Sequence, residues 1–294
     1  MIDDQTRKEI DKAVVKTLKE AGLREPPFLI HDLLEFLKID RDFYNLEDPG
    51  LLRRFWHHVK VKGRILSKIK EKIKLAAVWL PDRDRIYVDS SLPAPKQEWA
   101  SFHDVTHTIL KWHRPFFLGD TAQTLHPDFQ KTLEAEANYG ASALMFGSGV
   151  FTREARDISP EWKSIELLKK RYEKSYVTTL RRYVQFSHEI PMAVIVNTPW
   201  WKEKPDDQEH RCRHFVCSDS FKTRFACVTR DHIISEIDNN TLQRVGGPVG
   251  DFTLCLPDVN GDNHEFHAES FFNRHYLLTL VVHFRKLRKV GLIY

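Results

Sequence analysis

Few cysteines and no long apolar run are present in this sequence, and each absence narrows the class of protein. The 294 residues include four cysteines and no Cys-x-x-Cys pair, a sparse usage that suits a reducing compartment with buried or idle thiols. No apolar stretch approaches the roughly 18 residues of a membrane span. The polar start lacks the apolar core of a signal peptide. We therefore expect a cytoplasmic protein that is not embedded in a membrane.

The excess of positive charge is also small. A formal net charge of +4 and a pI near 8.7 do not by themselves indicate nucleic-acid binding. Basic residues gather in two segments, 53–74 and 161–186, where apolar residues recur at helical spacing between them. The pattern favours amphipathic helices with solvated basic faces, those of 161–186 packing on the N-terminal core. A nucleic-acid or partner-docking surface is the alternative and is not favoured.

Two domains of unequal size are predicted from a change of pattern near residue 189. Upstream, apolar residues recur with a helical period, and two β-rich runs flank a turn-prone sequence at residues 81–84. Downstream, short apolar runs alternate with Gly-, Pro- and Asn-rich turn sequences. The predicted helices span 4–22, 30–37, 95–113, 128–146 and 159–187, and the predicted hairpin spans 75–89. We expect an α+β fold, with a helical domain and a small hairpin or sheet over residues 1–188. A smaller, mostly β or α+β domain of unknown role would follow over residues 189–294.

The most informative segment is Phe102-His103-Asp104-Val105-Thr106-His107. Zinc peptidases with an H-E-x-x-H helix use two histidines at i and i+4 as metal ligands, and the Glu beside the first histidine activates water. On a helix, His103 and His107 lie about 40° apart around the axis, so both imidazoles can reach one ion. The Glu position is held by Asp104, which is therefore the candidate catalytic base.

A third ligand is predicted on the helix at 128–146. Glu134, Ala137, Asn138 and Ala141 follow the spacing i, i+3, i+4, i+7, which places a carboxylate and small side chains on one helix face. The small residues let this helix approach the histidine helix closely. Glu136 points about 200° away from Glu134. We therefore predict Glu134 as the third ligand and Glu136 as the second choice.

Two other interpretations compete for the third ligand. His113 stands six residues after His107, the spacing of the metzincin pattern H-E-x-x-H-x-x-G-x-x-H. That pattern needs a Gly to turn the chain out of the helix, and the position holds Leu110. A continuing helix would carry His113 off the shared face. The other interpretation is an amphipathic helix with incidental histidines, which would make Glu134 an ordinary surface residue.

Residues 99–113 and 134–145 together resemble the ImmA/IrrE family of metallopeptidases. Its pattern is an H-E-x-x-H helix followed by E-x-x-A-[ND]-x-[FY]-A-x-x-L-M. The likeness is strong at these two segments and looser over roughly residues 5–187. The chain departs from the pattern at Asp104, at Gly140 and at Phe146.

The resemblance implies a zincin-like domain in which His103, His107 and Glu134 hold a zinc ion. It also implies an endopeptidase that cleaves a specific regulatory protein, often a helix-turn-helix repressor that controls stress-response or mobile-element genes. Asp104 complicates this expectation, because its carboxylate ends one C–C bond, ~1.5 Å, short of a Glu carboxylate. A displacement of about 1 Å can cost on the order of a hundredfold in rate. A catalytically weak or inactive metal-binding regulator linked to transcription is therefore the alternative.

Overall fold

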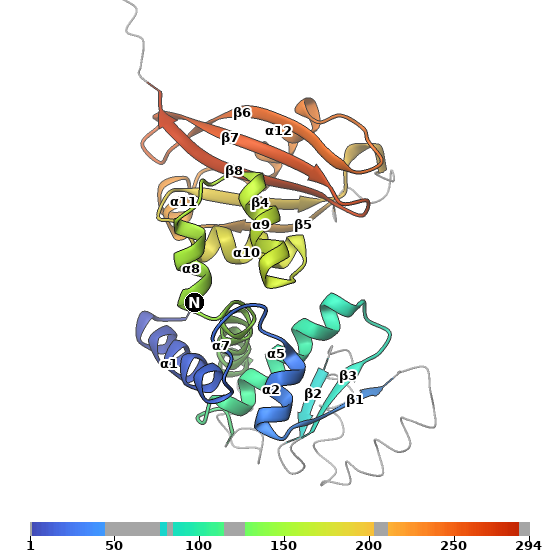
Figure 1. Cartoon of the computed structure of the whole chain (residues 1–294). Coiled ribbons are helices and arrows are strands. Elements are labelled where there is room, and N and C mark those ends of the chain that lie inside the picture. Colours follow the sequence, from blue (N-terminus) through green and yellow to red (C-terminus); the bar gives the residue numbers. More distant parts are fainter. Residues whose placement is uncertain (1, 45–76, 81–84, 115–126, 203–210, 288–294) are drawn as a thin grey trace, which may run out of the picture. The chain divides into compact units, whose positions relative to one another are not determined.

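The computed structural model describes residues 2–44, 77–80, 85–114, 127–202 and 211–287 (Figure 1). Its contacts divide the chain into two compact units, Met1–Val150 and Phe151–Tyr294. The predicted α+β fold is confirmed, because helices dominate the first unit and a five-stranded antiparallel sheet dominates the second. No helix among the described residues is both long and apolar enough to cross a membrane. The helix predicted within 53–74 lies outside the described residues.

The first unit combines helices with a small sheet. Helix α1 begins where the Asp3 side chain accepts a hydrogen bond from the backbone N–H of Thr6, and α2 ends at Lys38 in the left-handed conformation. The elements are α1 (Asp4–Glu20), α2 (Ile30–Leu37), β1 (Asp40–Tyr44), β2 (Ala77–Leu80), β3 (Arg85–Asp89), α5 (Ala94–Ile109) and α7 (Pro127–Phe146), with α8 (Gly149–Arg156) crossing the boundary between units.

The small sheet leads the chain into the histidine helix. Its strand order is β1-β3-β2, with β1 parallel and β2 antiparallel to β3. The antiparallel pair, with Ala77 opposite Val88 and Leu80 opposite Arg85, confirms the strand pairing of the predicted hairpin. Its turn at 81–84 and its first two residues lie outside the described residues. Ile86 and Val88 on β3 are fully buried, and both β2 and β3 contact α5. The sheet therefore fixes the start and direction of α5.

Helices α5 and α7 pack at very short range. Ala137 and Ala141 of α7 are fully buried, as predicted for a small-residue face. Asn138, which was predicted to share that face, is exposed. There is no room for a side chain at Gly140, where an added Cβ would lie 2.4 Å from Cγ2 of Thr106 on α5. A glycine at this position is therefore needed for the observed spacing of the two helices.

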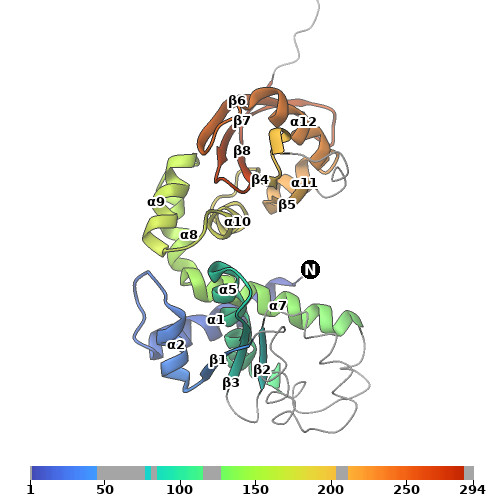
Figure 2. The same cartoon turned by 90° about the vertical axis from the view of Figure 1, so that its right-hand side faces the viewer.

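The second unit is built on one antiparallel sheet in the order β5-β4-β8-β7-β6. Helices α11 and α12 cover one face, where an apolar cluster joins them to β4, β6, β7 and β8 (Figure 2). The elements are α9 (Trp162–Tyr172), α10 (Tyr176–Phe186), β4 (Met192–Asn197), the 3-10 helix η2 (Trp200–Lys202), β5 (Cys212–Cys217), α11 (Asp219–Arg224), α12 (Arg230–Asn240), β6 (Gly247–Pro257), β7 (Asn263–Phe272) and β8 (Leu277–Lys286).

The helical segment predicted at 159–187 differs from the structure in two respects. It consists of two helices, because Glu173 adopts a left-handed conformation that ends α9 and Ser175 caps α10. These helices also belong to the second unit and not to the N-terminal core: α10 contacts β4 and β5, and Trp162 of α9 stacks on Phe271 of β7 at 5.1 Å. The boundary by contacts thus lies at 150/151, whereas we predicted 188/189.

The short distance at Gly140 predicts an effect on stability. In Gly140→Ala, a higher helix propensity would add up to about 1 kcal/mol, but overlap with Thr106 costs about 1–3 kcal/mol. We expect the free energy of unfolding to fall, with a lower urea midpoint followed by circular dichroism. Adding Thr106→Ser, which removes Cγ2, should restore the midpoint. Gly149→Ala is the control, because no atom lies within 4 Å of its added Cβ; an unchanged midpoint in Gly140→Ala would contradict the packing.

The burial of Cys217 in β5 predicts its reactivity. Burial raises the pKa of this thiol to about 12, so the thiolate, which is the reactive form, is scarce at pH 8. Cys227 and Cys255 are exposed. Brief treatment with iodoacetamide at pH 8 should label these two first and leave Cys217 unmodified, as measured by mass spectrometry of peptides. All four cysteines should react in denaturant, and equally fast labelling of Cys217 in the native protein would refute the described sheet.

Candidate metal centre

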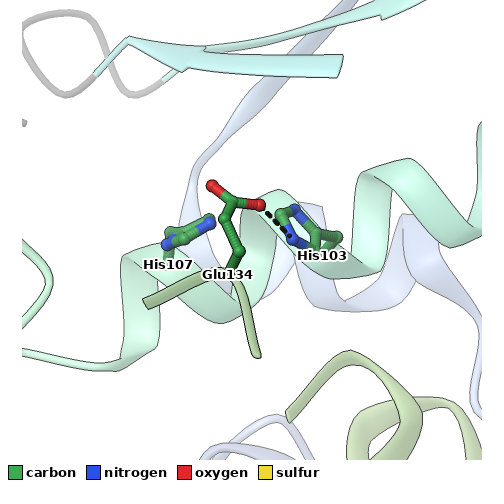
Figure 3. A group of neighbouring side chains, drawn as sticks. All are labelled: His103, His107 and Glu134. Carbon is green, nitrogen blue, oxygen red and sulfur yellow. Dashed lines mark ion pairs between the residues drawn. The ribbon is translucent and has the colours of Figure 1, made fainter. Parts of the chain in front are cut away.

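Helices α5 and α7 bring together three side chains that can act as metal ligands (Figure 3). One donor atom from each of His103, His107 and Glu134 lies within 4.8 Å of the other two. Nε2 of His103 is 3.2 Å from Oε2 of Glu134, and the two imidazole rings are 4.8 Å apart at 77°. The three residues predicted as ligands are therefore neighbours in space, although Glu134 comes from a different helix.

The donor set fits a zinc ion. Two imidazole nitrogens and one carboxylate oxygen are the protein ligands of many catalytic zinc sites, in which a fourth position stays open for water or substrate. The three side chains also differ in exposure, since His107 is buried whereas the side chain of Glu134 is 45% exposed. An ion held here would be anchored in the core and reachable from solvent on the Glu134 side.

The electrostatics of His103 favour a positive charge at this point. Burial by itself would lower the pKa of His103, but the interactions with Asp104 and Glu134 outweigh it and raise the pKa to about 9. The imidazole therefore carries a proton at pH 7. A bound cation would replace that proton and satisfy the same two carboxylates.

Asp104 approaches His103 from the other ring nitrogen. Its Oδ1 lies 3.4 Å from Nδ1 of His103, whereas Glu134 faces Nε2. Asp104 is buried at 5% exposure. A carboxylate at the nitrogen that does not bind the metal commonly fixes the orientation of a ligating histidine. Asp104, the predicted base, thus contacts Nδ1 of the predicted ligand His103, while Glu134 contacts Nε2.

The structure corrects our prediction for residues 95–113. Helix α5 ends at Ile109, and Leu110 adopts an extended conformation while its N–H still bonds to the carbonyl of Thr106. The chain turns immediately, and Nδ1 of the fully buried His113 lies 2.7 Å from Nδ1 of His107. The expectation that a continuing helix would separate the two histidines is wrong, because the helix stops one turn earlier. His113 nevertheless lies outside the group formed with Glu134.

Glu136, the second choice as ligand, has other partners. Its Oε2 accepts a hydrogen bond from Nε1–H of Trp112 at 2.7 Å and lies 2.9 Å from Nε2 of His113. Burial would raise the pKa of Glu136, but the bonds from His113 and Trp112 outweigh it and lower the pKa. The sequence analysis missed this cluster. Glu136 is separated from Trp112 and His113 by 24 and 23 residues, and no sequence feature shows that α5 ends before them.

Comparisons with known proteins agree with this geometry. Residues 51–183 match the family model for the IrrE N-terminal-like domain of peptidase family M78. No curated protein matches the chain. Among solved structures, a Mycobacterium tuberculosis transcriptional regulator is 12% identical, with a TM-score of 0.52, over 95% of this chain and 76% of its own. At this identity the likeness concerns the fold alone. The predicted resemblance to the ImmA/IrrE family is thus confirmed by the family model over residues 51–183, which form an IrrE N-terminal-like domain.

Proposed function

We propose that the protein is a zinc-dependent endopeptidase that cleaves a specific regulatory protein. The observation that carries this proposal is the convergence of His103, His107 and Glu134 within a domain of a peptidase family. We propose these three residues as the zinc ligands. A helix-turn-helix repressor is the proposed substrate. The M. tuberculosis protein of similar fold is described as a transcriptional regulator, which agrees with a partner of this class.

Within this proposal each side chain has a defined task. A zinc ion in the site would supply Lewis-acid activation of a water molecule. Asp104 would accept the proton of that water and deliver it to the leaving amine, which requires hydrogen-bonding distance to both. Its position at Nδ1 of His103 means that the carboxylate has to turn away from the imidazole to do so. His103 and Glu134, which lie 3.2 Å apart, would both stay in place as ligands of that ion.

A second function is favoured by the same contact. If Asp104 stays at Nδ1 of His103, it serves to orient a ligand and no base acts on the water. The protein would then be a metal-containing regulator with little or no hydrolytic activity. The short, buried side chain of Asp104 supports this alternative, because its carboxylate ends one C–C bond, ~1.5 Å, short of a Glu carboxylate.

Zinc binding should depend on the three ligands. We expect one zinc per chain in a competition titration with a chromophoric chelator. The affinity should fall by more than about a hundredfold in His107→Ala and in Glu134→Gln, which is beyond the range of outer-shell contacts. Matched controls are His31→Ala, an exposed histidine on α2, and Asp128→Asn, an exposed carboxylate in the first turn of α7. Zinc affinities equal to wild type in both ligand variants would eliminate the site.

Variants of Asp104 separate the two functions. Zinc-loaded protein is incubated with the helix-turn-helix protein encoded nearest to its gene, and fragments are identified by mass spectrometry. If Asp104 is the base, Asp104→Asn keeps the zinc affinity and cleaves on the order of a hundredfold more slowly. If Asp104 only orients His103, Asp104→Asn weakens zinc binding by about 10–100-fold and the wild type cleaves nothing. Cleavage by Asp104→Glu together with an inactive wild type would also assign the protein to the regulator class.

A further inference from the structure

A chain of buried hydrogen bonds ends at Nδ1 of His107. It runs from Oε2 of Glu136 to Nε2 of His113 at 2.9 Å, and from Nδ1 of His113 to Nδ1 of His107 at 2.7 Å. The three residues are between 0% and 7% exposed. Burying polar groups of this kind is costly unless each is hydrogen-bonded, so the chain is a defined arrangement of partners.

The order of donors in this chain follows from its carboxylate end. A carboxylate accepts hydrogen bonds, so Nε2 of His113 must donate to Glu136. In a neutral His113, Nδ1 is then unprotonated, and it accepts a hydrogen bond from Nδ1–H of His107. In that tautomer of His107 the unprotonated ring nitrogen is Nε2. A neutral imidazole binds a metal ion through its unprotonated ring nitrogen.

The carboxylate itself is held by a second donor. Nε1–H of Trp112 bonds to the same Oε2 of Glu136 at 2.7 Å. Trp112 and His113 are consecutive residues that follow the end of α5, so one turn of chain delivers both donors to one oxygen. This pairing limits rotation of the Glu136 side chain, because a change of its torsion angles would break two bonds at once.

We propose that Glu136 and His113 are positioning residues that keep His107 in the tautomer and orientation needed to bind a cation through Nε2. This inference rests on the zinc site of the proposed function. It gives His113 and Glu136, which were weighed as alternative ligands, a role through His107 in place of direct coordination. Partners of this kind typically contribute 10–100-fold to metal affinity.

The second unit provides an internal control. There Nδ1 of the fully buried His264 lies 3.1 Å from Nε2 of His283, and its Nε2 lies 3.2 Å from Oδ2 of Asp258. The guanidinium of Arg224 lies 3.3 Å from the same Nε2, a neighbour that disfavours a metal cation. His264→Leu therefore removes a buried histidine from a similar chain of bonds without touching the zinc site.

The test compares zinc affinities of full-length variants by chelator competition. His113→Leu fills the space without an acceptor and should weaken zinc binding by about 10–100-fold. His113→Asn offers a side-chain oxygen near the position of Nδ1 and should recover most of the affinity. Glu136→Gln should weaken binding by about tenfold, while His264→Leu should stay within about twofold of wild type.

A readout specific to positioning is the protonation of His107. In long-range ¹H–¹⁵N spectra of the zinc-loaded protein, His107 should carry its proton on Nδ1 and coordinate through Nε2. In His113→Leu the Nδ1 proton should lose its hydrogen-bonded shift and exchange with water. A packing role alone would lower thermal stability in His113→Leu and His113→Asn alike, without the recovery of zinc affinity in the Asn variant.

Each outcome assigns success or failure to a separate claim. If the wild type binds zinc and a folded His113→Leu binds it equally well, the positioning role is overturned while the zinc site stands. If His113→Leu does not fold, Glu136→Gln becomes the deciding variant, and an unchanged zinc affinity in it overturns the positioning role. If the wild type binds no zinc, the site and the positioning role both fail. If the variants behave as expected but no substrate is cleaved, only the peptidase proposal fails.

Discussion

The close contact between α5 and α7 is the constraint on which the candidate site depends. Glu134 reaches His103 only because the two helices meet at Gly140 and Thr106, where a methyl group would already overlap. The same packing buries Ala137 and Ala141 and brings Glu136 to Trp112 and His113. Glu134, the proposed ligand, and Glu136, which bonds to Trp112 and His113, thus lie on different faces of α7. The spacing of the two helices at Gly140 is therefore a condition for every contact of the candidate site.

The three residues proposed as ligands could be predicted because each signal is local. His103 and His107 share a helix, and Glu134 is marked by the small residues that follow it on one face. The hairpin before α5 was predicted for the same reason, since a turn sequence separates two β-rich runs. The positions of His113 and Glu136 could not be obtained in this way. They depend on where α5 ends, and Leu110 has no sequence feature that would stop a helix there.

The packing of α9 and α10 in the second unit could not be predicted from helical periodicity. Strand β4 is buried along its whole length, so its second face needs a cover, and α10 provides it. A pattern of apolar residues on a helix shows which face is buried but not against what. Strand β7, by contrast, has only one face buried in the core. Its residues alternate between buried and half-buried positions from His264 to Phe272, which is the period of a strand with one face toward the core.

The segment that matches the family model differs from the segment that forms the first compact unit. The family match runs from residue 51 to residue 183, whereas the contacts change units after Val150. A fragment cut at residue 188 would keep the whole family signature and yet strip α9 and α10 of the sheet they rest on, leaving Trp162 without Phe271. The end of the family match therefore does not mark the end of a unit that packs by itself.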